Sequence, residues 1–258
     1  MRWLIVVAFI GAFPLGSIAQ TRENEKIIFL DKNGQPAAEK KAAFQQQIVQ
    51  VDDTTWEYNF YRKNGPLIRS SQTSDAQGRV LNGRIIAYSP VGRPDTIGYY
   101  KRGVQTGDWS YYTSAGPLLL RRHYDDGVLI WAKDSATVRR EADSAKAARL
   151  SLRIAGDTDA AFPGGDTAWL RYLNKTLRYP DDAVMNNIMG TVEVTFAVDT
   201  VGHIPEQSAW ISRSVSLSID QEALRIMRRS PAWTPAIYKG RLTWSYKRQP
   251  IVFKLETR

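Results

Sequence analysis

The sequence predicts an α+β fold with two domains: an N-terminal all-β meander, and a C-terminal domain in which helices pack on a small antiparallel sheet. The length of 258 residues favours two domains, because a domain usually holds about 100–200 residues. A spacing of 24 residues recurs between residues 83 and 127, which is typical of stacked hairpins. After residue 160, apolar residues fall first at helical spacing and then at every second position, which predicts helices and strands in one small domain.

The first twenty residues are predicted to be a secretory signal peptide. Arg2 precedes an apolar run that ends at Pro14, and the small residues Ser17 and Ala19 stand before the expected cleavage site, after Ala19 or Gln20. A helix that spans a bilayer needs about 20 apolar residues, and this run is shorter. We therefore expect export to the periplasm, and an inner-membrane anchor that leaves the chain facing the periplasm stays the alternative.

Charge and cysteine content exclude several classes of function. A chain without cysteine has no disulfide framework, no thiol chemistry and no lipid anchor on that residue. The formal net charge is +9, but the basic residues are spread along the chain. An exported protein also does not share a compartment with nucleic acids, the partners that its basic charge would favour in the cytoplasm. We therefore expect a mildly basic surface that faces anionic envelope components, and no nucleic-acid partner.

Residues 21–131 are predicted to form the all-β domain. The following pairs of residues each lie 24 positions apart: Gly83 and Gly107, Tyr88 and Tyr112, Gly92 and Gly116, Tyr100 and Tyr124, and Gly103 and Gly127. Aromatic segments that alternate with glycine turns at such a period indicate stacked β-hairpins, with aromatic residues such as Trp109 between the repeats. The pattern resembles MORN-type repeats in their bacterial variant over about residues 27–131. This resemblance implies a spacer or interaction surface without chemistry of its own.

Residues 132–160 are predicted to be a linker between the domains. The stretch is charged and rich in alanine, and it permits a helix as far as about Leu152. It carries no continuous apolar face, so nothing in it predicts packing against a core. The second domain would then span residues 161–258.

Two helical patterns stand out in this second domain. Apolar residues from Trp169 to Leu177 recur at helical spacing, and Pro180 should end that helix and begin a second, short one. Further on, Ser218 followed by Gln221 resembles a capping box at the start of another amphipathic helix. The residues expected in the core of this domain are Trp169, Phe196, Leu224 and Trp244.

Strand patterns occupy the rest of the second domain. Alternation over residues 191–198 predicts a strand with one buried face, and a turn leads to a second strand at about residues 204–211. In the last strand, the apolar residues change from even to odd positions, which predicts a bulge or break near residues 248–250. Proline cannot donate to a ladder, so Pro250 places this strand at the edge of the sheet.

Three stretches of the second domain carry a family resemblance. They are FPGGDTAWLRYLNKTLRYPDDAV from Phe162, GTVEVTFAVDTVGHI from Gly190, and DQEALRIMRRSPAWTPAIYKGRLTWSYKRQPIVFKL from Asp220. Together they resemble the C-terminal domain of TonB, in the form common in Bacteroidetes, over about residues 161–257. The glycines of the first stretch resemble no phosphate-binding loop, because no strand precedes them and no Lys-Ser or Lys-Thr follows.

The resemblance implies a binding function and a site for it. In that family an outer-membrane receptor offers a short extended segment, the TonB box, which pairs with the open edge strand by β-augmentation. The resemblance also implies ExbB and ExbD as partners if the N-terminus is retained. Carried over to this sequence, the partner-binding residues are Arg178, Tyr179, Pro180, Thr243, Trp244, Ser245, Tyr246, Lys247 and Arg248.

Two other classes of function compete with receptor binding. A signal peptide and β-repeats stand where TonB has an anchor and a proline-rich rod, so peptide binding is better supported than energy transduction. The alternative is an envelope scaffold whose edge strand pairs with itself in a homodimer or with wall-associated proteins. An enzyme is not expected, because no motif links His123 or His203 to a nucleophile or a metal cluster, and no cofactor is expected either.

Overall fold

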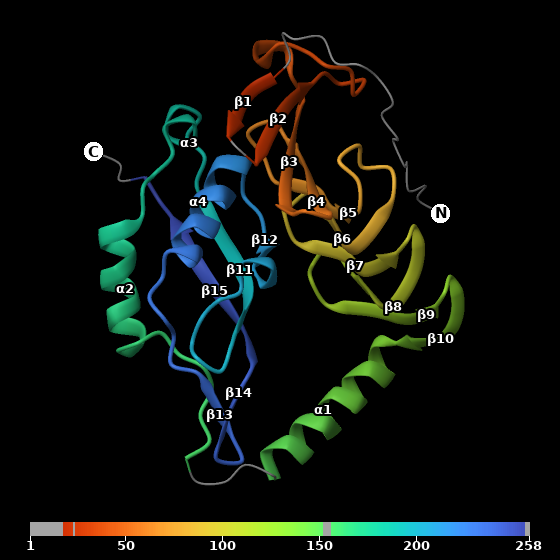
Figure 1. The fold of residues 1–258 in the computed structure, drawn as a ribbon, viewed down its shortest axis with the longest axis vertical. Helices are drawn as coiled ribbons and strands as arrows, with labels where there is room; N and C mark the ends of the chain where they lie inside the picture. The colour runs from red at the N-terminus through yellow and green to blue at the C-terminus, as the bar shows by residue number, and fades with distance from the viewer. Residues whose placement is uncertain (1–17, 23, 152–155, 256–258) are drawn as a thin grey trace. The chain divides into compact units, whose positions relative to one another are not determined.

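The chain forms two units in the computed structural model, which describes residues 18–22, 24–151 and 156–255. Among these described residues, those within 18–90 and 94–133 form one unit, and those within 91–93 and 134–255 form the other (Figure 1). Most of the predicted signal peptide lies outside the described residues, and only residues 18–20 belong to a described element. Among the described residues, no helix has the length and apolar character that crossing a membrane requires.

The first unit is a single antiparallel sheet of ten strands that follow one another in sequence order, so the predicted all-β meander is confirmed. A short 3-10 turn, Glu39–Lys41, lies between its second and third strands. The strands are β1 (Ile18–Arg22), β2 (Glu25–Leu30), β3 (Phe44–Asp52), β4 (Thr55–Arg62), β5 (Leu67–Thr73), β6 (Leu81–Tyr88), β7 (Pro94–Lys101), β8 (Val104–Tyr112), β9 (Leu118–Asp125) and β10 (Val128–Asp134).

The 24-residue spacing corresponds to one hairpin of this sheet. The turn after β7 has φ of 51° at Arg102 and 82° at Gly103, and the turn after β9 has φ of 44° at Asp126 and 84° at Gly127. A two-residue hairpin loop of this kind needs positive φ at both positions, and glycine takes the second at no steric cost. The repeated glycines at positions 103 and 127 are therefore fixed by turn geometry.

Aromatic side chains pack between the repeated hairpins, as the sequence predicts. Trp109 is 3% exposed, and its ring meets Tyr100 edge-on at 5.3 Å and Tyr124 edge-on at 6.1 Å. Tyr111 stacks on the same ring at 6.4 Å, and burial raises the pKa of Tyr111 to about 12. The ring of Trp109 lies against Gly98 on the neighbouring strand, where a side chain would collide with it.

Helix α1 (Ser135–Ser151) occupies most of the segment predicted to be a linker. The end of that segment belongs to the second unit, because Thr158 exchanges two backbone hydrogen bonds with Ile237 (3.1 and 2.9 Å). Ala160 is 1% exposed and lies in the core of the second unit. Contacts with the core and with Ile237 of this unit thus begin a few residues before residue 161, the expected start of the domain.

We expect this difference to be measurable on fragments. A fragment of residues 156–258 should unfold cooperatively in urea, whereas residues 161–258 should be less stable by about 1–3 kcal/mol, since the shorter fragment loses two backbone hydrogen bonds and the buried Ala160. Urea denaturation followed by circular dichroism measures both free energies of unfolding. Equal stabilities would mean that residues 156–160 contribute nothing to the fold.

The second unit packs helices on a three-stranded antiparallel sheet of order β12-β11-β15. A 3-10 turn, Glu206–Ser208, precedes β12, and β13 and β14 form a separate hairpin. The remaining elements are α2 (Gly165–Thr176), α3 (Asp181–Met185), β11 (Gly190–Val198), β12 (Trp210–Arg213), α4 (Leu217–Arg228), β13 (Ala236–Tyr238), β14 (Arg241–Thr243) and β15 (Ser245–Phe253).

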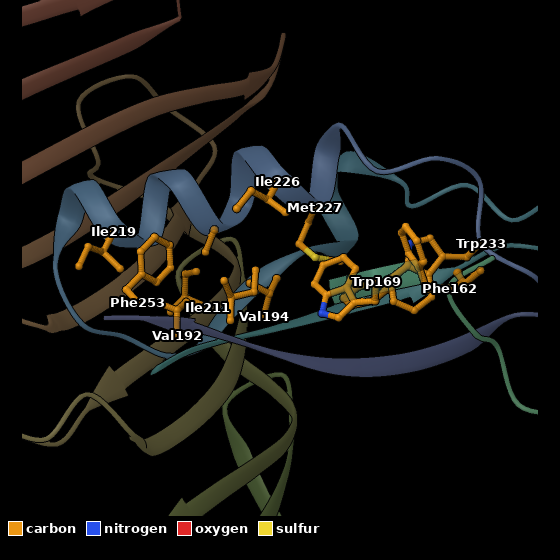
Figure 2. Packing of buried hydrophobic residues seen from close by; sticks show 14 of the residues in the cluster. Phe162, Trp169, Val192, Val194, Ile211, Ile219, Ile226, Met227, Trp233 and Phe253 are labelled. Carbon is orange, nitrogen blue, oxygen red and sulfur yellow. The ribbon is translucent and has the colours of Figure 1, made fainter. Parts of the chain in front are cut away.

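The core of this unit lies between α4 and one face of the sheet (Figure 2). Ile219 and Ile226 of α4 are fully buried, and they lie over Val192 and Val194 of β11, which are fully buried as well. At the other end of the cluster, Trp169, Trp233 and Phe162 form a group of aromatic rings. The expected core residues Trp169 and Phe196 are confirmed, at 5% and 0% exposed, and Leu224 is partly buried against the cluster.

Helix α4 begins one residue after Ser216 and not at the predicted capping box. Ser216 is the N-cap residue, but its side chain caps no backbone amide of the helix. Asp220, which is fully buried, accepts hydrogen bonds from the Ser214 hydroxyl (2.6 Å) and the Val215 amide (3.0 Å). The prediction of Ser218 and Gln221 as a capping box was wrong, because Asp220 is the residue that reaches back from the first turn.

The predicted bulge near residues 248–250 was also wrong. β15 pairs with β11 residue for residue from Gly190↔Phe253 to Val198↔Ser245. The even-numbered apolar residues need no bulge, because they lie on the opposite face from Ile251 and Phe253: Trp244 is 58% exposed and Tyr246 is 76% exposed. Trp244, expected in the core, is therefore a surface residue. The edge position predicted from Pro250 is correct, since β15 ends the sheet.

Candidate functional site

The open edge of β15, meaning the long side of Ser245–Phe253 that faces away from β11, is the candidate site. β15 is nine residues long, and within the described residues β11 is its one neighbour in the sheet. A strand in this position presents a row of unpaired backbone groups, to which an extended segment of another chain can pair. The open edge is therefore the part of this unit best suited to binding a peptide.

Hydrogen bonds on the side of β11 that faces away from β15 show which residues of β11 direct their backbone groups toward β15. The Ser212 hydroxyl donates to the carbonyl of Glu193 (3.1 Å), and the Ala197 amide donates to the Ser208 hydroxyl (3.2 Å). Odd-numbered residues of β11 thus direct their backbone groups away from β15. In an antiparallel pair the direction alternates from residue to residue, so the even-numbered residues of β11 face β15.

The register then assigns every backbone group along β15. Phe196 of β11 is opposite Lys247, so the amide and carbonyl of Lys247 face β11. Those of Tyr246 and Arg248 face the open edge. Pro250 also falls in the outward set, where its missing amide hydrogen costs no hydrogen bond within the sheet. The open edge consequently offers both donors and acceptors at residues 246, 248 and 252, and only an acceptor at residue 250.

The side chains of β15 and of Trp244 before it alternate in the same way between an exposed face and a half-buried face. Trp244 and Tyr246 stand on the exposed face, at 58% and 76%, together with Arg248, which is also exposed. Ser245 and Lys247 are half-buried on the face that continues to Ile251 and the core. Two large aromatic side chains thus lie in solvent directly beside the unpaired backbone.

The segment that carries the open edge is rich in basic residues. Between residues 239 and 255 the sequence contains no Asp or Glu. The basic residues of this stretch are Lys239, Arg241, Lys247, Arg248 and Lys254. Such a local excess of one sign favours the approach of an acidic partner, and salt weakens the effect.

Tyr179 and Pro180 lie at the other end of β15 from the aromatic pair. The Tyr179 hydroxyl donates to the carbonyl of Ile188 (2.7 Å), and its ring meets Phe253 edge-on at 5.7 Å. Phe253 is about 17 Å along the strand from Arg248, at about 3.4 Å per residue. The structure therefore separates the predicted binding residues into two groups, and Tyr179 is held by contacts within the domain.

Arg178 joins a network of hydrogen bonds that the sequence analysis missed. Its amide donates to the Glu222 carboxylate (2.7 Å), which also accepts two bonds from Arg225 (2.6 Å each). Arg225 donates in turn to the carbonyl of Thr176 (2.6 Å), and the hydrogen bonds to Glu222 raise the pKa of Arg225. This network ties the end of α2 to α4. A Glu and an Arg three residues apart on one helix could have signalled the pair.

Thr243, His123 and His203 each occupy a hydrogen-bonded or paired position. Thr243 ends β14, where it is opposite Ala236. Nδ1 of His123 lies 2.6 Å from Asp108 on neighbouring strands of the first unit, and His203 follows a turn whose Asp199 carboxylate accepts its amide hydrogen. In the part of the chain that the structure describes, no three His, Cys, Asp or Glu side chains gather as metal ligands would.

Comparisons with known proteins bear on the C-terminal unit. Neither the curated proteins nor the solved structures gave a significant match to the chain. One family model does match, and the matched region begins within α2 and includes all of β11, α4 and β15 with its open edge. The match covers residues 175–255, and the family is described as the Gram-negative bacterial TonB protein C-terminal.

Proposed function

We propose that this chain is a TonB-like protein of the periplasm that binds outer-membrane receptors by adding an extended receptor segment to the open edge of β15. Export depends on the predicted signal peptide, residues 1–20. The N-terminal sheet, with its MORN-like repeat, serves as a spacer or second interaction surface. The proposal contains no catalytic step and no cofactor.

The open edge is the single observation that carries this proposal. Residues 246 and 248 direct unpaired backbone donors and acceptors outward, and this edge belongs to a domain of the TonB C-terminal family. Backbone pairing supplies affinity with modest demands on sequence, which suits a partner common to several receptors. Participation in energy-dependent transport, through ExbB and ExbD, would additionally need a retained N-terminal anchor.

The second candidate is an envelope scaffold. A long strand with unpaired backbone groups can pair with its own copy as well as with a foreign segment. The ten-stranded sheet also gives the chain a second extended surface. In this case the protein would form a homodimer or bind wall-associated proteins, and receptor segments would not compete for the edge.

Proline substitutions at neighbouring positions test the proposed function. Arg248→Pro removes a donor that faces outward, so the fold should survive while the affinity for a receptor segment falls at least about tenfold. Lys247→Pro removes a donor that faces β11 and should instead destabilise the domain by about 1–3 kcal/mol. Calorimetric titration with N-terminal receptor peptides measures binding, and urea denaturation measures stability.

The two variants differ by one position, which makes each the control for the other. Equal loss of binding in both, with both folded, would contradict the assigned backbone directions. Unchanged binding in Arg248→Pro would reject strand addition at this edge. A homodimer that receptor peptides do not dissociate, detected by sedimentation, would favour the scaffold.

A further inference from the structure

The exposed aromatic pair, Trp244 and Tyr246, lies beside the open edge. These two rings allow the edge to select a partner strand by its side chains as well as by its backbone. A residue of an added strand that lies opposite Tyr246 projects its side chain on the same face as Tyr246. Trp244 lies two positions earlier and, like Tyr246, is largely exposed. Alternate side chains of a bound strand would therefore pack on these two rings, and apolar side chains gain most from this contact.

Pro250 limits how far a partner strand can follow the edge. It lies in the outward set and has no amide hydrogen, so a partner carbonyl placed there would find no donor. An unsatisfied carbonyl at that point costs free energy in the complex. Pairing is therefore favourable at Tyr246 and Arg248 and unfavourable at Pro250.

Charge restricts the partner further. The stretch from residue 239 to residue 255 carries basic side chains and no acidic ones. Arg248 is exposed on the same face as the aromatic pair, and Lys247 lies between the two outward-facing residues 246 and 248. An acidic segment would pair with these charges, whereas a basic segment would be repelled.

We propose that the open edge of β15 selects a short acidic segment that carries apolar side chains at every second residue, packed on Trp244 and Tyr246, with backbone pairing that ends before Pro250. This inference rests on the proposed function, because it assumes strand addition at this edge. It goes further in naming the composition and pattern of the segment that the edge prefers.

Two fluorescent heptapeptides of identical composition, made of valine and glutamate, provide the test. In one the two residue types alternate, and in the other the valines are contiguous. Fluorescence polarisation with the full-length chain should show at least about tenfold tighter binding of the alternating peptide, because only alternation brings each valine to the aromatic face. Replacing its glutamates by glutamine should weaken binding at low salt, and the difference should shrink at high salt.

Matched variants locate the selecting side chains. Trp244→Ser and Tyr246→Ser should each reduce the preference for the alternating peptide to within about threefold, because they remove the apolar contact and leave the backbone edge intact. Val252→Ser is the control, since Val252 is 51% exposed on the same face but lies beyond Pro250. This variant should keep the full preference.

The outcomes separate the inference from the proposed function. If receptor segments bind but the two heptapeptides bind equally, or if Val252→Ser acts as strongly as Tyr246→Ser, the pattern selection is wrong and strand addition stands. If neither receptor segments nor heptapeptides bind, both proposals fall. A self-association constant that drops in Tyr246→Ser, with no peptide binding, would replace the acidic segment by a second copy of the chain.

Discussion

Phe196→Ala should destabilise the C-terminal unit by about 3–5 kcal/mol. Phe196 lies on the central strand β11, is fully buried, and meets the ring of Trp233 edge-on at 4.9 Å. Truncation removes the transfer free energy of the ring and leaves a cavity among side chains that are already fixed between α4 and the sheet. A loss of this size is a large part of the total stability of a small domain.

Hydrogen exchange of the full-length chain measures this loss unit by unit. Amides of β11 and α4 should lose protection in Phe196→Ala, while those of β6 to β9 should keep it. Val201→Ala is the control, because Val201 is 64% exposed in a turn and its truncation should change stability by less than about 0.5 kcal/mol. Equal effects of the two substitutions would contradict the assignment of the core.

Periodic elements of the second unit could be predicted from the sequence because one face of each is buried. Alternation over residues 191–198 predicted β11, which spans Gly190–Val198, and helical spacing from Trp169 to Leu177 predicted α2, which spans Gly165–Thr176. The second strand was expected at about residues 204–211 and is found at Trp210–Arg213. Pro205 explains this shift, since its carbonyl accepts the Ser208 amide (2.9 Å) and hydroxyl (2.7 Å) in a 3-10 turn.

The side of β15 on which each residue lies could not be predicted in the same way. The parity argument assumed that Trp244 and Tyr246 pack in the core, as apolar residues usually do. However, this rule holds in one direction. Residues in a core are mostly apolar, but apolar residues also occur on surfaces. The prediction inferred a bulge because it placed the side chains of Trp244 and Tyr246 in the core. The same two exposed rings distinguish the open edge chemically.

The candidate site was predicted in part. The sequence indicated the edge strand through Pro250, and the family resemblance added Tyr179 and Pro180 to the same site. Sequence does not give the distance between two segments that contact one strand, and here they contact opposite ends of it: Tyr179 packs on Phe253, whereas Trp244 precedes the first residue of β15. The hydrogen-bond network of Glu222 was missed because its partners come from two helices.

Gly98→Val is expected to have the largest effect in the N-terminal sheet. A Cβ atom at this position would lie 2.2 Å from the ring of Trp109, which is 3% exposed and bounded by Tyr100 and Tyr124. The ring cannot move aside without breaking those contacts, so overpacking should cost about 3 kcal/mol, at the upper end of its usual range. Valine favours strands, and therefore strand propensity would predict the opposite sign.

A second background separates the collision from any other effect of valine. In Trp109→Leu, whose smaller side chain leaves room above residue 98, the additional cost of Gly98→Val should fall below about 1 kcal/mol. Hydrogen-exchange protection of β7 and β8 amides in the full-length chain, compared across the four proteins of this cycle, gives both values. An equal cost of Gly98→Val in both backgrounds would show that the backbone, and not the Trp109 ring, requires the glycine. The close approach of β7 and β8 would then need an explanation other than aromatic packing.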